Sequence, residues 1–255
     1  MTDWTGRTVF VTGATAGFGA AIARRYAAAG ARLVVCGRRT DRLEALAAEL
    51  DAPVHALTLD VRDRKAVFAA IEALPAEFAA IDVLVNNAGL ALGLEPAHEA
   101  DLDEWEAMVD TNVKGLMFVT RAVLPGMVAR DRGHIVNLSS IAGTYPYPGG
   151  NAYGATKAAV SQLSLNLIAD LINTGVRVTS IEPGLCGGSE FSVVRFRGDA
   201  EAAAKVYADT TPLTSADVAE AVFWATSLPA HVNINRIEMM PVTQGPAGLA
   251  VHRRK

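Results

Sequence analysis

Tyr153 and Lys157 are four residues apart, and Ser140 precedes the tyrosine by thirteen residues. On a helix, side chains at i and i+4 project from one face, so the ammonium group would lie near the phenol oxygen. Lowering the phenol pKa from about 10 by roughly 3 units requires about 4 kcal/mol. One positive charge at about 4 Å supplies an energy of that order. The spacing predicts an acid/base, Tyr153, tuned by Lys157; the alternative is an ordinary helix with two solvated polar residues.

A glycine-rich turn near the start of the chain is the second feature with chemical meaning. Gly13, Gly17 and Gly19 lie between an apolar run at 7–12 and an Ala-rich helical segment. In dinucleotide-binding folds this first turn rests the pyrophosphate on a helix N-terminus, and glycines permit the tight turn and the close backbone approach. Glycines are common in turns of every kind, so the cluster alone is weak evidence. Its location at the first strand–helix junction is what predicts a nucleotide site.

Arg38 and Arg39 directly follow the second predicted strand and Gly37. Folds that select NAD usually place an acidic residue near this strand end, where it accepts a hydrogen bond from the ribose 2′-hydroxyl. A guanidinium cannot accept that bond, but it suits a 2′-phosphate. The pair therefore predicts NADP(H) over NAD(H), and the alternative is two solvated arginines before a helix.

Short apolar runs alternate with helical segments along the chain. We expect strands at 7–12, 32–36, 54–59, 81–85, 134–138, 176–181 and 234–240. We expect helices at 17–30, 40–50, 63–78, 103–130, 151–174 and 215–228. The alternation predicts one α/β domain over 1–255, a Rossmann-type, doubly wound parallel sheet of about seven strands with helices on both faces. Segment 184–211 is the least regular, and we expect it to form a substrate loop or lid.

Composition narrows the class of protein. The chain is 51% hydrophobic and 20% charged, with a net charge of −4, which argues against a nucleic-acid partner. No apolar run is long enough for a membrane span, and the N-terminal residues lack a signal-peptide pattern, so we expect a cytoplasmic protein with no membrane partner. The scattered histidines and two distant cysteines predict no metal site. We expect the basic residues 252–255 to be solvated.

Taken together, the motifs resemble the short-chain dehydrogenase/reductase family over nearly the whole chain. The matching positions are the glycine turn, Asp60, Asn86 to Gly89, Asn112, Ser140, Tyr153, Lys157, Pro183 and Gly184. Stretches 90–98, 181–191, 194–199 and 229–244 resemble the branch of this family that acts with NADP on small 3-hydroxy acids. The resemblance implies hydride transfer to or from substrates of the serine, allo-threonine and 3-hydroxypropionate/malonic semialdehyde type.

The resemblance also implies a role for individual residues. Ser140 would hydrogen-bond the substrate oxygen, Tyr153 would exchange its proton, and Lys157 would bond the nicotinamide ribose. Asn112 would complete the catalytic set by holding a relay water, or would be a satisfied amide in a bent helix. NADP(H) would contact Gly13, Thr15, Ala16, Gly17, Phe18, Gly19, Arg38, Arg39, Asp60, Val61, Asn87, Ala88, Gly89, Tyr153, Lys157, Pro183, Gly184, Leu185 and Gly187. A homotetramer, with contacts through helices 103–130 and 151–174, is implied as well.

A 3-hydroxy acid also brings a carboxylate, which needs a cation or several donors when it is buried. The irregular segment offers Arg195, with Arg197 as the second choice, so Ser140, Tyr153 and Arg195 form the predicted substrate set. The alternative is a surface helix with two solvated arginines. Two other functions stay open: a reductase of another short carbonyl (sulfoacetaldehyde or 3-oxoacyl type), and a nucleotide sensor without catalysis. The joint presence of Ser140, Tyr153 and Lys157 counts against the sensor.

Overall fold

The computed structural model describes residues 3–246. Its strands are β1 (Thr8–Thr12), β2 (Arg32–Gly37), β3 (Val54–Thr58), β4 (Ile81–Asn86), β5 (Gly133–Leu138), β6 (Val176–Pro183) and β7 (Arg236–Met239). Its α-helices are α1 (Gly17–Ala27), α2 (Thr40–Glu49), α3 (Arg64–Glu72), α4 (Leu102–Val109), α5 (Leu116–Ala129), α6 (Asn151–Asp170), α7 (Phe191–Arg195), α8 (Ala200–Lys205) and α9 (Ser215–Ser227). A π-helical turn, η1 (Asp110–Gly115), joins α4 to α5, and a 3₁₀ turn, η2 (Ile141–Gly143), follows β5.

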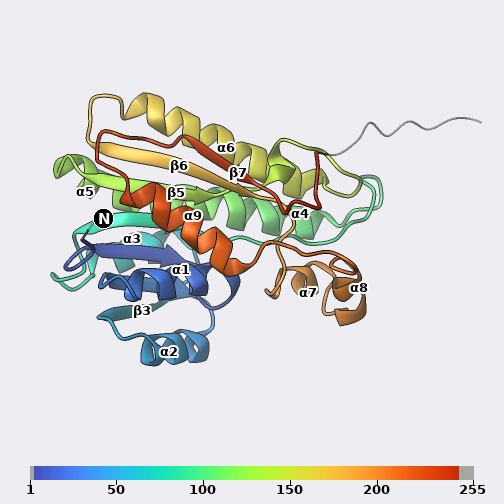
Figure 1. The fold of residues 1–255 in the computed structure, drawn as a ribbon, viewed down its shortest axis with the longest axis horizontal. Helices are drawn as coiled ribbons and strands as arrows, with labels where there is room; N and C mark the ends of the chain where they lie inside the picture. The colour runs from blue at the N-terminus through green and yellow to red at the C-terminus, as the bar shows by residue number, and fades with distance from the viewer. Residues whose placement is uncertain (1–2, 247–255) are drawn as a thin grey trace, which may run out of the picture.

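The strands form one sheet in the order β3-β2-β1-β4-β5-β6-β7, and every neighbouring pair is parallel. Helices cover both faces of this sheet (Figure 1). Parallel strands need crossover connections, and those crossovers place helices over both faces. The predicted doubly wound parallel sheet is therefore confirmed.

Alternate residues of β1 show how the sheet builds two cores. Val9 and Val11 pack into a cluster with residues of α1 and α9, whereas Phe10 packs into a second cluster with residues of α3 and α5. Successive side chains of a strand point to opposite faces, so a strand covered on both faces is apolar throughout. The five residues of β1 are accordingly all buried.

The strand order reverses beside β1, which lies between β2 and β4. In open α/β sheets a ligand binds outside the carboxyl ends of the strands at such a reversal. The turn after β1, the end of β2 and the loop after β4 meet at this edge, so the fold places the predicted nucleotide residues together.

Some helices differ from the predicted ranges. The helix expected at 63–78 ends at Glu72, because Pro75 has no backbone N–H and disfavours helical backbone at the residue before it. The helix expected at 103–130 is continuous but contains the π-helical turn η1, which includes Asn112. The helix expected at 151–174 ends at Asp170.

Segment 184–211 is more ordered than a plain loop. It carries α7 and α8, and the Asp199 side chain caps α8 by accepting from the Ala202 backbone N–H. Figure 1 shows both short helices beside the sheet, outside the two helical layers. Residues 252–255, predicted to be solvated, lie outside the described residues.

Candidate active site

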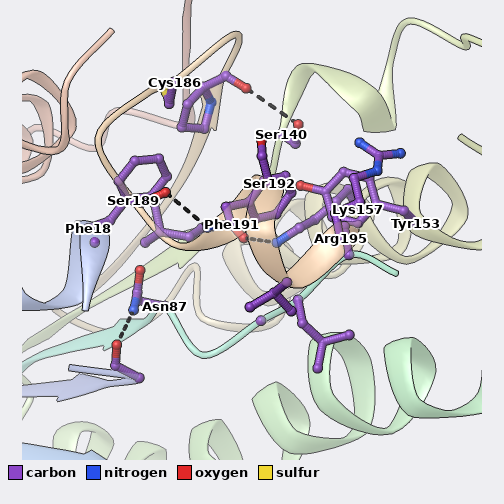
Figure 2. Close-up of a pocket in the computed structure, with 18 of the residues that line it drawn as sticks. Phe18, Asn87, Ser140, Tyr153, Lys157, Cys186, Ser189, Phe191, Ser192 and Arg195 are labelled. Atoms are coloured by element: carbon purple, nitrogen blue, oxygen red, sulfur yellow. Dashed lines mark hydrogen bonds between the residues drawn. The ribbon is translucent and has the colours of Figure 1, made fainter. Parts of the chain in front are cut away.

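A cavity of about 890 Å³ opens at the carboxyl edge of the sheet. The turn after β1, the ends of β2 and β4, the start of α6 and the segment around α7 all contribute to its wall. Figure 2 shows Ser140, Tyr153, Lys157 and Arg195 grouped in one part of this pocket, apart from Phe18 and Asn87. The cavity therefore joins the predicted nucleotide turn to the predicted catalytic residues.

Three predicted catalytic residues line this cavity: Ser140, Tyr153 and Lys157. Ser140 follows β5, and its hydroxyl accepts from the Ala142 backbone N–H at 3.1 Å, which fixes the side chain at the start of η2. Tyr153 and Lys157 lie on α6 and are almost fully buried. The Lys157 Nζ atom donates to the Leu138 carbonyl at 2.8 Å and lies 5.8 Å from the centroid of the Tyr153 ring.

Burial governs the electrostatics of this pair. Burial raises the pKa of Tyr153 above its usual value, and the hydrogen bond from Ser140 and the charge of Arg195 act against that rise. Burial also lowers the pKa of Lys157 to about 8. Desolvation dominates both groups, and the Lys157 ammonium faces the Leu138 carbonyl rather than the phenol oxygen. The tuning of Tyr153 by Lys157 therefore stays a prediction for the site with its cofactor bound.

Asn112 lies in η1 behind the cavity wall and has all its polar atoms in use. Its Oδ1 accepts from the Leu90 backbone N–H at 2.8 Å, and its Nδ2 donates to the Leu90 carbonyl at 2.9 Å and to the Thr156 hydroxyl at 3.0 Å. A Cβ built on Gly89 would lie 3.2 Å from Asn112 Oδ1 and 3.5 Å from Lys157 Nζ. Asn112 thus ties the loop after β4 to α6, next to the Lys157 ammonium.

The glycine turn has the shape of an anion cradle. Gly13 and Gly17 adopt φ values of +66° and +54°, which favour glycine. The Asn87 amide donates to the Gly13 carbonyl at 3.0 Å, and a Cβ on Gly19 would lie 2.6 Å from that amide nitrogen. Ala16, at the N-cap of α1, gives no side-chain cap, so N–H groups of the first turn remain available to a phosphate.

The predicted cofactor positions fall into two groups. Those lining the cavity are Gly13, Thr15, Ala16, Gly17, Phe18, Arg38, Arg39, Asp60, Val61, Asn87, Ala88, Gly89, Tyr153, Lys157, Pro183, Gly184 and Leu185. Gly19 packs beneath the turn, and Gly187 packs on the Pro212 ring, so neither is part of the wall. Cys186 does line the cavity, and burial raises its thiol pKa to about 12, which keeps it unreactive.

The arginines after β2 have partners that the sequence did not reveal. Arg39 donates to the Thr15 hydroxyl at 2.9 Å and to Glu190 Oε2 at 2.8 Å. Arg42 donates to Glu190 Oε1 at 2.8 Å, whereas Arg38 is exposed beside the cavity. The only sequence signal for Glu190 was its charge within segment 184–211.

At the other end of the cavity, Arg195 faces Tyr153, the predicted acid/base. Its guanidinium donates to the Tyr147 hydroxyl at 2.7 Å and lies 5.6 Å from the Tyr153 ring centroid. Arg197 instead pairs with Glu95 and Glu104 and is absent from the cavity wall. The structure therefore separates the two arginines that the sequence left as alternatives.

Two aromatic residues at this end are absent from the predicted site residues, although Phe191 ends the stretch 181–191 that resembles the family. Tyr147 lines the cavity next to Arg195, and the Phe191 ring centroid lies 5.8 Å from that of Tyr153. Their sequence signal was weak, because Tyr147 sits in a Pro- and Gly-rich stretch and Phe191 in the irregular segment. Among residues 3–246, no group of three or more His, Cys, Asp or Glu side chains could hold a metal ion.

The comparisons with known proteins agree with this geometry. A family model described as short chain dehydrogenase matches residues 7–196. The chain therefore belongs to the short-chain dehydrogenase family, as its motifs predict, and it is an oxidoreductase.

Individual relatives are more specific. The chain is 62% identical over 245 residues to the NADP-dependent 3-hydroxy acid dehydrogenase YdfG of Salmonella typhi, covering 96% of this chain and 99% of that protein. It is 50% identical over 246 residues to the serine 3-dehydrogenase of Agrobacterium fabrum, covering 96% and 98% of the two chains. A solved closed form of serine dehydrogenase complexed with NADP+ superposes with a TM-score of 0.94 at 59% identity, covering 97% of this chain and 100% of that one.

Proposed function

We propose that this protein is an NADP-dependent 3-hydroxy acid dehydrogenase that acts on small substrates such as serine, allo-threonine and 3-hydroxypropionate or its semialdehyde. One observation carries the substrate class: the Arg195 guanidinium and the Tyr147 hydroxyl, 2.7 Å apart, line the same cavity as Tyr153. A buried carboxylate requires such a cation and donor. The names of the relatives support the same substrate class.

The residues present fit NADP(H) as the cofactor. The left-handed glycines and the open N-terminus of α1 suit the pyrophosphate, while Arg38 and Arg39 suit a 2′-phosphate. When bound, NADP supplies a nicotinamide that accepts or returns the hydride. Lys157, whose ammonium is buried beside Gly89, would bond the nicotinamide ribose.

The catalytic side chains divide the remaining work. Ser140 would hold the substrate hydroxyl, and Tyr153 would take its proton as the hydride leaves C3. Since burial raises the pKa of Tyr153, a positive charge nearby helps the phenolate to form, and Arg195 already acts in that direction. Phe191 would exclude water from the reacting carbon, because its ring packs against Tyr153.

The test is a panel of substrates, with the rate of each reaction measured from the change in NADPH absorbance. Malonic semialdehyde, sulfoacetaldehyde, an acetoacetyl thioester and propanal are compared in reduction, and serine, L-allo-threonine and 2-propanol in oxidation. We expect malonic semialdehyde and the hydroxy acids to have much the highest kcat/KM. Equal or better kcat/KM with propanal and 2-propanol would refute a carboxylate site, and a preference for sulfoacetaldehyde or the thioester would assign the protein to another branch.

We further propose that segment 184–211 is the lid of this site and that the enzyme is a homotetramer in the cytoplasm. Exposed apolar side chains support the assembly, for Met117 on α5 is 47% exposed and Leu165 on α6 is 39% exposed. Among the described residues, no helix is long and apolar enough to cross a membrane. Light scattering on the purified protein tests the tetramer, and a fluorescent fusion tests the compartment.

A further inference from the structure

Glu190 is the point at which the lid meets the arginines that follow β2. Each carboxylate oxygen accepts from one guanidinium: Oε2 from Arg39 and Oε1 from Arg42, both at 2.8 Å. The partners are 151 and 148 residues away in the chain. Arg39 lines the cavity and Arg42 does not, so one of the two pairs lies outside the site.

The carboxylate directly precedes α7, the short helix that carries Phe191 and Arg195 into the cavity. At the far end of this helix, Arg197 forms ion pairs with Glu95 and Glu104. Ion pairs therefore hold α7 at both ends, one on the cofactor side and one on the substrate side. Figure 2 shows Phe191 and Arg195 beside Tyr153 and Lys157, so a change in the seating of α7 would reach the catalytic residues.

The arginines around Glu190 carry more positive charge than Glu190 neutralises, so a 2′-phosphate can bind beside it. Arg38, Arg39 and Arg42 carry three positive charges against the single negative charge of Glu190. A phosphate monoester carries close to two negative charges at neutral pH. Glu190 and the phosphate together would thus balance the three arginines, and the exposed Arg38 can meet the phosphate without displacing Glu190.

We propose that Glu190 is a positioning residue that seats α7 on Arg39 and Arg42, so that Phe191 and Arg195 face the hydroxy acid. The assignment rests on the proposed function for its substrate. It gives Arg42 a role in holding the lid rather than in binding the cofactor. It also makes Arg39 common to 2′-phosphate recognition and to lid seating.

The experiment uses Glu190→Gln, Arg42→Gln and the double variant. Exposed ion pairs contribute about 1 kcal/mol or less individually, so we expect the KM for serine or L-allo-threonine to rise roughly two- to fivefold in each single variant at low salt, with kcat nearly unchanged. The double variant should be no worse than Glu190→Gln, because Glu190→Gln already removes the negative charge that Arg42 meets. The matched control is Glu49→Gln at the end of α2, which removes a somewhat more exposed carboxylate that pairs with Arg24 of α1, away from the lid.

Two further readouts separate seating from general damage. High salt should raise the wild-type KM and shrink the difference between wild type and variants, because the pairs are exposed to solvent. Trypsin should cleave after Arg195 and Arg197 faster in Glu190→Gln and Arg42→Gln than in Glu49→Gln. This cleavage does not depend on turnover, so it tests the seating of α7 even if no hydroxy acid is a substrate.

Unchanged hydroxy-acid KM and unchanged trypsin cleavage in Glu190→Gln would overturn the proposal while leaving the proposed function intact. So would tighter NADPH binding with an unchanged hydroxy-acid KM, which would mean that Glu190 competes with the phosphate. A third result would be a rise in the KM for NADPH alone in Arg42→Gln, while the KM values for NAD(H) and for the hydroxy acid stay unchanged. That result would make Arg42 a cofactor-binding residue and would also overturn the assignment.

Discussion

The buried ammonium of Lys157 should make the ligand-free protein less stable than a variant without it. Its side chain is almost fully buried, it makes one hydrogen bond, to Leu138, and its pKa falls from 10.5 to about 8. A fall of this size corresponds to about 3 kcal/mol of unfolding free energy. We expect Lys157→Met to recover about 2 kcal/mol at pH 7, after about 1 kcal/mol is deducted for the lost hydrogen bond.

The pH dependence has a definite sign. Between about pH 8 and pH 10.5 the unfolded chain holds the lysine proton while the folded protein releases it, so wild-type stability rises with pH relative to Lys157→Met. The advantage of the variant should therefore be complete at pH 7 and should fall to nearly zero by about pH 9.5. Below pH 8 both states are protonated, and the difference should be constant.

Urea unfolding at pH 7.0, 8.5 and 9.5 measures this difference, with each ligand-free protein at the same concentration because assembly contributes to stability. Lys65→Met, at an exposed position on α3, is the control and should show no such trend. A Lys157→Met variant that is less stable than wild type at pH 7, or whose advantage is the same at pH 9.5, would show that the buried ammonium does not destabilise the folded protein.

Three further changes test the site itself. Tyr153→Phe should lower kcat by about 10²- to 10⁴-fold, while fluorescence titration should show little change in NADPH binding. In the wild type, the rate of hydroxy-acid oxidation should keep rising into alkaline pH, because burial raises the pKa of Tyr153. Arg38→Ala with Arg39→Ala should reduce the NADP-over-NAD ratio of kcat/KM by roughly tenfold to a hundredfold, and a retained ratio would refute the phosphate role. Arg195→Ala should cut kcat/KM for serine by about tenfold or more while hardly affecting a neutral alcohol; equal losses on both would place Arg195 in fold or cofactor binding instead.

Local patterns in the sequence were sufficient for the sheet and for much of the cofactor site. The βα alternation predicts a parallel sheet because buried parallel strands must be apolar on both faces. Gly13 and Gly17 could be read because their left-handed backbone is a local property that favours one residue type. Tyr153 and Lys157 could be paired because one helix fixes the relation between i and i+4. Even the early end of α3 was available in Pro75, a signal that the predicted range 63–78 passed over.

Only the tertiary structure decided how strongly burial shifts the pKa values of Tyr153 and Lys157 and which charges meet across the cavity. The pKa direction of Tyr153 depends on the desolvation that the surrounding elements create, and no spacing encodes that amount. Arg195 and Arg197 lie in the same irregular segment, with Arg195 the first choice and Arg197 the second from the sequence. Only the structure shows that Arg195 reaches Tyr147 while Arg197 reaches Glu95 and Glu104. Contacts of this kind join residues far apart in the chain, from 48 positions between Arg195 and Tyr147 to 151 between Glu190 and Arg39, so they exist only after the chain has packed.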